Sequence, residues 1–259
     1  MLSNGLHVNG TALATALQGA VGAGVSVTGG LAGDLADFAK TLVIADDAAG
    51  EDIVAAIGFH GDALEVGFGS FGGWRAFGPM RQITKAQGSV LHELDGKGGL
   101  AKYKEYLNEH AAELPASALL FPILVTREGA TQGVVRTVLA IDNDAESMTF
   151  AGDIPLGGTA QLMHASTDRL VAGAESAARL ARAAMTDTPT LAILVSCVGR
   201  RLVMKQRVEE EIDAVREVVG AATTLTGFYS YGELCPQAVG APCELHNQTM
   251  TITLLRERN

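Results

Sequence analysis

Residues 191–197 read LAILVSC, an apolar run without alternation between polar and apolar side chains. A strand of this kind is buried on both faces, so it must lie inside a sheet that is covered on each side. An amphipathic helix is predicted over 206–220, and strands are predicted over 224–232 and 246–255. The inward face of that helix is expected to carry Val208, Ile212, Val215 and Val219. The end of the chain therefore predicts a layered α/β fold.

The rest of the chain alternates short helices and strands in the same way. Apolar spacing predicts helices over 11–21, about 100–107 and 166–185, with Ser166 or Thr167 as the cap of the last one. The core face of that last helix is expected to carry Leu170, Ala174, Ala177 and Ala181. Strands are predicted over 25–28, 42–45, 53–59, 119–125, 134–141 and 148–154. The turn at 60–62 predicts a hairpin that joins 53–59 to 64–69.

An internal repeat links the two ends of the chain. Near the start, LSNG enters a helix that leads to VTGGLAGD; near the end, VSCVG enters a helix that leads to LTGFYSYGE. Each copy thus joins a Ser-Gly turn, a helix and a Thr-Gly strand that ends on an acid, Asp34 or Glu233. Duplication explains this order, and chance resemblance between short glycine-rich pieces is the alternative.

The repeat predicts the fold class. We expect a mixed α/β (α+β) protein of duplicated halves, with predominantly antiparallel sheets flanked by helices, or with one sheet packed on another. The second copy has a long apolar strand before its turn, whereas the first copy begins at Met1. We therefore expect either a chain shortened relative to longer relatives, or a strand supplied by a partner or a crossed-over segment.

Charge and cysteine usage exclude several classes of function. The net charge is −10 and Lys and Arg form no block, so a nucleic-acid partner is not expected, because phosphate binding requires clustered basic side chains. The three cysteines do not make a paired framework, and no signal-peptide pattern is present. No apolar run reaches the roughly 20 residues of a membrane span. We expect a cytoplasmic protein without membrane contact.

Several motifs occur in a fixed order along almost the whole chain. They read TGGLAGD, GSFGGWRAFGP, VLHELDGK followed by YKEYL, LPASALLFPI, SMTFAGDIP, GFYSYGEL and LHNQTMTITLL. Together they resemble the FIST sensory domain, with its N-terminal part over residues 1–115, lacking its beginning, and its C-terminal part over 116–259. The order of these motifs is more specific than any one of them.

The resemblance implies a role in bacterial signal transduction. FIST domains are sensory domains expected to bind small ligands, with amino acids suggested, and a subset resembles haem-binding nitric-oxide sensors. The motifs fill these 259 residues, so we expect the signal to pass to a separate partner, such as a histidine kinase or a cyclic-di-GMP enzyme. A homo-oligomer is left open.

The first glycine-rich strand end suggests one wall of a polar ligand site. Backbone N–H groups at Thr28, Gly29, Gly30 and Gly33 could approach a carboxylate or a phosphate closely. Asp34 could pair with an ammonium group of the ligand. A tight strand exit and a solvated carboxylate are the alternatives.

The second copy suggests the opposite wall. Tyr229, Tyr231 and Glu233 fall on one strand face at a period of two, which suits an amino-acid ligand; tyrosines packed with hydroxyl groups at the surface are the alternative. Asn247 and Thr249 begin a row of small hydrogen-bonding side chains that either lines a wet cleft or forms a solvent face. We expect the ligand between the two halves.

The loop between residues 69 and 80 carries the only tryptophan, Trp74, beside Arg75. Arg75 could clamp a ligand carboxylate while Trp74 forms an apolar wall. A loop held to the core by its aromatic side chains is the alternative. If the ligand is haem, an axial His or Cys is required, and His246 and His164 are the candidates.

The sequence favours a binding protein over an enzyme. Ser196 and Cys197 lie between a strand and a helix, as a hydrolase nucleophile would, but neither lies in a G-x-S-x-G motif. We expect Cys197 to be buried and unreactive. The other cysteines match no zinc-site spacing.

Overall fold

The computed structural model describes residues 1–258, which form two compact units. Unit 1 contains Met1–Gly73 together with the chain from Ser166 onward, and unit 2 contains Trp74–Ala165. Each unit is built around one eight-stranded sheet with helices packed on it. The predicted mixed α/β class is confirmed. Within residues 1–258, no helix is both long enough and apolar enough to cross a membrane.

Unit 1 combines two segments that are far apart in the sequence. Its elements are β1 (Leu2–Ser3), α1 (Gly10–Val21), β2 (Gly29–Ala32), β3 (Val43–Ala45), β4 (Ala48–Gly50), β5 (Val54–Ala55), β6 (Leu64–Phe71), α3 (Thr167–Arg182), β15 (Leu191–Cys197), α4 (Val198–Met204), η3 (Lys205–Arg207), α5 (Val208–Val219), β16 (Thr224–Pro236), β17 (Cys243–His246) and β18 (Met250–Glu257). The sheet has the order β5-β1-β2-β16-β15-β18-β6, with β17 paired to β16; β3 and β4 form a separate hairpin.

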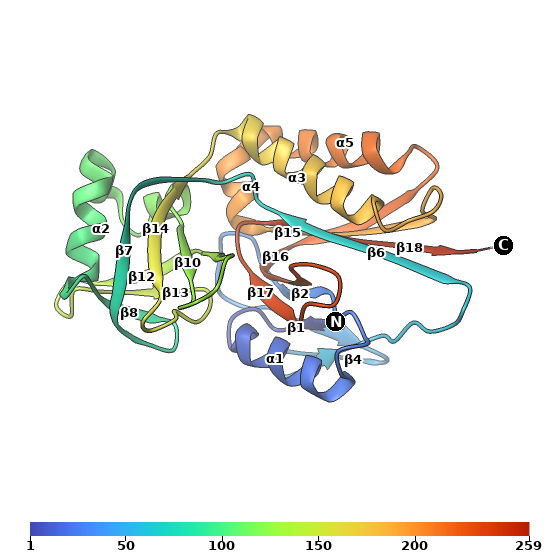
Figure 1. Ribbon diagram of the computed structural model, residues 1–259, viewed down its shortest axis with the longest axis horizontal. Coiled ribbons are helices and arrows are strands. Elements are labelled where there is room, and N and C mark those ends of the chain that lie inside the picture. The colour runs from blue at the N-terminus through green and yellow to red at the C-terminus, as the bar shows by residue number, and fades with distance from the viewer. Residues whose placement is uncertain (259) are drawn as a thin grey trace. The chain divides into compact units, whose positions relative to one another are not determined.

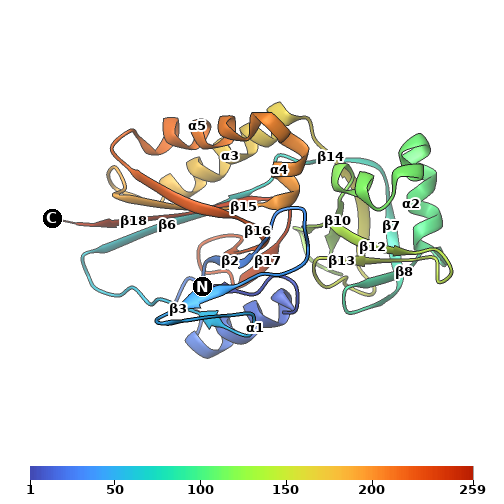
Figure 2. The same ribbon diagram turned by 180° about the vertical axis from the view of Figure 1, so that it is seen from behind.

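Helices cover both faces of this sheet (Figures 1 and 2). On one face, α3 packs over β6 and β18 and against α5, and on the other α1 packs over β17. The four residues predicted for the core face of α3 are all completely buried. Gly67 of β6 allows this close packing, because a Cβ there would lie 2.1 Å from the carbonyl oxygen of Ala181. Strand β15 lies inside the sheet, as its apolar sequence predicts.

The internal repeat is visible in the topology of unit 1. Strands β1 and β2 pair in parallel around α1, and β15 and β16 pair in parallel around α4 and α5. The two β-α-β copies meet where β2 pairs antiparallel with β16, with Gly30 opposite Glu233. The strand ends with which the two copies finish are therefore neighbours in one sheet.

Unit 2 is an antiparallel sheet with helices from one segment packed on it. Its elements are β7 (Arg75–Gln87), β8 (Val90–Leu94), β9 (Lys97–Gly98), α2 (Gly99–Leu107), η1 (Asn108–Glu113), η2 (Ala116–Leu120), β10 (Ile123–Thr126), β11 (Val134–Arg136), β12 (Val138–Asp142), β13 (Ser147–Phe150) and β14 (Thr159–His164). The order is β11-β10-β14-β7-β8-β13-β12, with β9 paired to β8, and the sheet is curled (Figure 1). Helix α2 buries Leu100, Tyr103 and Leu107 in this core, at the predicted spacing.

Two local predictions for the first part of the chain are wrong. The strand predicted at 25–28 lies at Gly29–Ala32, because the glycines that were expected to stop it let neighbouring chains approach closely. The predicted hairpin around 60–62 is absent from the described residues. Strand β5 pairs with β1, whereas β6 pairs along its whole length with β18. Pairing with β18 places the small residues of β6 under α3, which a local hairpin would not do.

Candidate functional site

A buried polar centre lies in unit 1 beside β15, the strand that pairs with both β16 and β18. Glu233 on β16 is completely buried, and its carboxyl group accepts hydrogen bonds from Ser230 Oγ at 2.6 Å and from the backbone N–H and the hydroxyl of Thr249 at 3.1 and 2.9 Å. Burial raises the pKa of Glu233 to about 7, although these hydrogen bonds oppose the shift. The carboxyl group can therefore exchange a proton near neutral pH.

A β-bulge sets the direction of the Glu233 side chain. The pairing of β16 with β2 shifts in register between Ser230 and Gly232, which interrupts the period of two along the strand. Tyr229, Tyr231 and Glu233 consequently bond to different partners. The expectation of one regular strand face that carries all three side chains is wrong.

The last predicted strand is also interrupted. Strand β17 ends at His246 and β18 begins at Met250, and the residues between them form a buried turn. Gln248 in this turn has a φ of 62°, in the left-handed region that is strained for residues with a side chain. Its side-chain nitrogen lies 2.5 Å from the position that a Cβ on Gly199 would take, so any larger residue at position 199 would displace the Gln248 amide.

Asn247 in the same turn is an unusual buried side chain. It is completely buried, and within residues 1–258 neither Oδ1 nor Nδ2 has a hydrogen-bond partner. Burial of an amide without a partner costs about 1–3 kcal/mol. Asn4 is equally buried, but its Nδ2 donates to the Thr41 carbonyl oxygen at 3.1 Å, and its Oδ1 accepts from the N–H groups of Leu6 and His7 at 2.7 and 2.8 Å. The amide of Asn247 can thus both donate to and accept from a bound molecule.

The centre continues into a buried ion pair. Arg200 on α4 donates from Nη2 to Glu211 Oε2 on α5 at 2.8 Å, and both side chains are completely buried. Glu211 Oε1 accepts from Ser196 Oγ at 3.1 Å and from Tyr229 Oη at 2.9 Å. Burial, aided by the Glu211 carboxylate, raises the pKa of Tyr229. Sequence reasoning missed Arg200 and Glu211, although Glu211 lies three residues from Val208 on the inward stripe of the predicted helix.

Arg200 also bonds the backbone near both places where the chain passes between the units. Its Nη1 donates to the Gly72 carbonyl oxygen at 2.7 Å, and its Nη2 donates to the Leu170 carbonyl oxygen at 2.8 Å. The chain leaves unit 1 after Gly73 and returns to it at Ser166. Gly73 has a φ of 80°, and a Cβ there would lie 2.0 Å from a backbone carbonyl oxygen of α3. Arg200 therefore links the end of β6, through Gly72, to the first turn of α3, through Leu170, within unit 1.

Asp34 closes a loop on the surface of unit 1. Its carboxylate accepts hydrogen bonds from the hydroxyl of Tyr231 and, at 2.8 Å each, from the N–H groups of Ala39 and Lys40. These bonds, led by the one from Tyr231, lower the pKa of Asp34 to about 2. The Phe38 ring stacks on Tyr231 with centroids 4.8 Å apart. Asp34 and Tyr231, both predicted to face a ligand, thus bond to each other.

The predicted glycine wall is filled by the protein itself. A Cβ on Gly29 would lie 1.9 Å from the Met1 carbonyl oxygen, and one on Gly30 would lie 2.5 Å from the side chain of Val195. Close packing therefore requires glycine at both positions. Gly33 and Thr28 are engaged as well. A Cβ on Gly33 would lie 3.2 Å from the Tyr231 ring, and the hydroxyl of Thr253 donates to the hydroxyl of Thr28 at 2.8 Å.

Three predicted site residues lie in unit 2. Trp74 is buried at its start, whereas Arg75 and His164 are exposed and face each other in the pairing of β7 with β14. The imidazole of His164 packs edge-on against Phe77, with ring centroids 5.3 Å apart. Among the predicted residues, the structure brings Glu233 and Thr249 into direct contact in unit 1, with Asn247 in the same turn as Thr249.

One of the two histidines proposed as haem ligands is engaged by the protein itself. His246 is buried, and its Nε2 is bonded to the Cys235 carbonyl oxygen at 2.9 Å. Burial raises the pKa of Cys197, Cys235 and Cys243, so each side chain is a neutral thiol at physiological pH. The expectation that Cys197 is buried is confirmed. His164 is exposed. Across the described chain, no three His, Cys, Asp or Glu side chains could hold a metal ion together.

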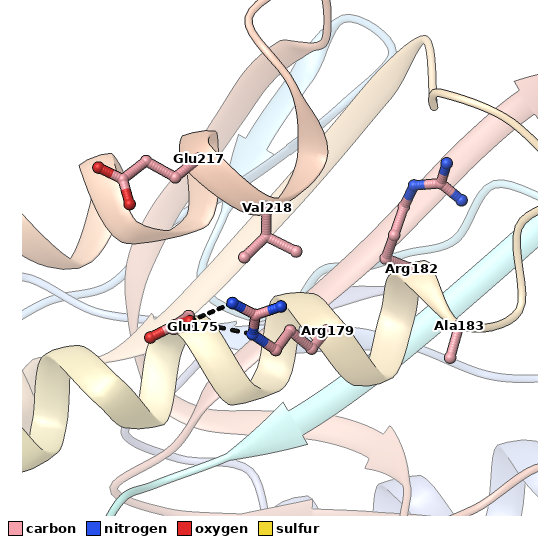
Figure 3. Close-up of a pocket in the computed structure, with 6 residues that line it drawn as sticks. All are labelled: Glu175, Arg179, Arg182, Ala183, Glu217 and Val218. Atoms are coloured by element: carbon pink, nitrogen blue, oxygen red, sulfur yellow. Dashed lines mark hydrogen bonds and ion pairs between the residues drawn. The ribbon is translucent and has the colours of Figure 1, made fainter.

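A separate groove of about 510 Å³ lies between α3 and α5 (Figure 3). It is lined by Glu175, Arg179, Arg182, Ala183, Glu217 and Val218. The Arg179 guanidinium is already paired with Glu175, which lies one turn earlier on α3, and both side chains are largely exposed. None of the residues predicted to bind a ligand lines this groove, and its charges are solvated, so it is the weaker candidate site.

The chain is thus a mixed α/β protein in which unit 1 contains a buried polar centre. Residues 1–97 match the family model of the FIST N domain, and residues 100–236 match that of the FIST C domain. The chain therefore belongs to the FIST family, whose domains are sensory domains in signal transduction. No curated protein and no solved structure matches the chain. The two family models meet inside unit 2, and the division that we expect after residue 115 stays a prediction.

Proposed function

We propose that this protein is a sensor that binds a small amine-bearing ligand of the amino-acid class at the buried polar centre of unit 1, and that it signals through a separate partner protein. One observation supports the location above all others. Asn247 is a completely buried amide without a hydrogen-bond partner among the described residues, two positions from Thr249, which bonds to Glu233. Unpaired buried amides are rare because they are costly, and binding sites are where they are tolerated.

The chemistry of the centre suits a zwitterion. An ionised Glu233 can accept hydrogen bonds from a ligand ammonium group, and Asn247 Nδ2 can donate to a ligand carboxylate. Because the pKa of Glu233 is about 7, its carboxyl group is largely protonated at pH 6 and largely ionised at pH 8. Binding of an ammonium group should therefore strengthen as the pH rises through this range.

The burial of the centre explains how binding could produce a signal. Asn247, Gln248 and Thr249 are all buried, so a ligand can reach them only in a conformation in which this turn has opened. A ligand that binds the opened form shifts the population towards it. The strained φ of Gln248 lowers the cost of leaving the closed form.

The test is calorimetric titration of the twenty amino acids at pH 8, with the corresponding hydroxy acids as ligands that lack the ammonium group. We expect at least one amino acid to bind, and both Asn247→Leu and Glu233→Gln to weaken its binding at least tenfold. Glu65→Gln is the matched control, since Glu65 is a buried carboxylate of the same sheet that bonds Thr186 instead. Binding that survives both substitutions, or no binding by any amino acid, would refute the proposal.

A further inference from the structure

Exposed apolar side chains are concentrated in one segment of unit 1. Of eighteen large hydrophobic residues exposed within residues 1–258, seven lie between residues 35 and 59, roughly a tenth of the chain. They are Leu35, Phe38, Leu42, Ile44, Val54, Ile57 and Phe59. Such a concentration typically marks a surface that another molecule covers.

The backbone of this segment holds its apolar side chains outward. In strand β3, Val43 is 3% exposed and the next residue, Ile44, is 72% exposed, so the hairpin presents one apolar face to the interior and one to solvent. Val54 is on β5, the outermost strand of the unit 1 sheet, and β5 lies beside β3. A sheet edge of this kind favours association with a partner.

The same region accounts for more than half of the net negative charge of the protein. Residues 34–62 contain seven acidic residues and a single basic one, Lys40, which gives a net charge of −6 out of −10 for the whole chain. The Asp34 carboxylate already accepts hydrogen bonds from the protein, and Glu51 Oε1 lies 3.4 Å from Lys40 Nζ. The side chains of Asp37, Asp46, Asp47, Asp52 and Asp62 are exposed.

We propose that residues 35–59 form a docking surface for a segment of a partner protein that carries apolar side chains flanked by Lys and Arg. The apolar residues supply contact area, and the acidic residues select a basic rim, which also speeds encounter. A second copy of this chain is disfavoured as the occupant, because it would bring the same acids face to face. This inference goes beyond the ligand site and does not depend on it.

The test uses the full chain and three fluorescein-labelled 18-residue probes: an amphipathic Leu/Lys helix, its Leu/Glu counterpart, and a scrambled Leu/Lys peptide. Fluorescence anisotropy should show the amphipathic basic probe binding at least tenfold more tightly than either other probe. Ile44→Ser with Ile57→Ser should weaken that binding at least tenfold, and Asp47→Lys with Asp52→Lys about fivefold. All four positions are exposed, so thermal unfolding monitored by circular dichroism should be unchanged.

The matched control is Leu180→Ser with Val239→Ser, which removes two exposed apolar side chains, 52% and 83% exposed, outside the segment. This variant should bind the probe like the unaltered chain. The proposal is overturned if both serine variants behave alike or if the acidic probe binds equally well. It is also overturned if sedimentation velocity shows a dimer that only the Ile44→Ser, Ile57→Ser variant loses, or if neutral phosphatidylcholine vesicles bind through the same residues.

Discussion

Two buried asparagines in unit 1 offer a sharp comparison. Asn247 and Asn4 are both completely buried, but only Asn4 has hydrogen-bond partners for its side chain among the described residues. Replacement of Asn4 by Leu removes three hydrogen bonds and leaves the Thr41 carbonyl oxygen and two N–H groups without their partner. At about 1 kcal/mol for each bond, and more for each group left buried, we expect a loss of about 3 kcal/mol in the free energy of unfolding.

The same substitution at Asn247 should act in the opposite direction. It removes an amide whose burial costs about 1–3 kcal/mol and replaces it with an apolar side chain of similar size, so the free energy of unfolding should stay the same or rise. The two variants therefore differ by about 3–6 kcal/mol, and in a chain of this length they should differ in Tm by roughly 6–24 °C, at about 2–4 °C per kcal/mol. A residue kept for binding at the expense of stability is expected to behave in this way.

The measurement should report on unit 1. The only tryptophan, Trp74, lies in unit 2, so its fluorescence reports the unfolding of unit 2 and not that of unit 1, which contains both asparagines. Far-UV circular dichroism follows mainly unit 1, because four of the five α-helices within residues 1–258, α1, α3, α4 and α5, belong to it and only α2 belongs to unit 2; urea titration then gives the free energy of unfolding. If Asn247→Leu costs as much as Asn4→Leu, Asn247 is a structural residue and the reasoning fails.

Three further predictions concern the charged and phenolic groups of unit 1. Arg200→Met or Glu211→Leu alone should cost about 3–5 kcal/mol because each leaves a buried charge unpaired, and the double variant should cost much less than the sum, as a double-mutant cycle in urea would show. The pKa of Glu233 is raised from 4.5 to about 7, so its contribution to the free energy of unfolding is complete below pH 4.5 and falls by about 3 kcal/mol as the pH rises to 7. Unfolding curves measured at a series of pH values should show this fall for the unaltered chain and not for Glu233→Gln. Tyr231→Phe should speed tryptic cleavage at the single lysine of the 34–40 loop, whereas an unchanged rate would contradict the role of this phenol in closing the loop.

Local periodicity made much of the fold predictable. The run LAILVSC defines β15 to the residue, and the apolar spacing of α3 identifies side chains that are completely buried. These features depend only on neighbours within one turn or one strand. Strand pairing, in contrast, depends on residues that are distant in the sequence. Strand β6 pairs with β18, near the other end of the chain, because α3 needs small residues beneath it. The sequence near 60–62 contains no trace of that requirement.

The site was predictable only in part, for a similar reason. Glu233 could be singled out as the acid that ends a Thr-Gly strand, and Thr249 as one of a row of small hydrogen-bonding residues, and the structure joins them. The bulge that separates Glu233 from Tyr231 arises from pairing between strands, and it is invisible in β16 alone. Arg200 was overlooked because an arginine next to a predicted helix is usually solvated, whereas here it is completely buried.

The double attachment of Arg200 has a consequence for cooperativity. The Arg200 guanidinium bonds the carbonyl oxygen of Gly72, just after β6, and that of Leu170, in the first turn of α3. Because one side chain makes both bonds, a change that withdraws Arg200 would break both of them together. We therefore expect the end of β6 and the start of α3 to be released from Arg200 together or not at all, since packed interiors jump between arrangements and do not deform gradually.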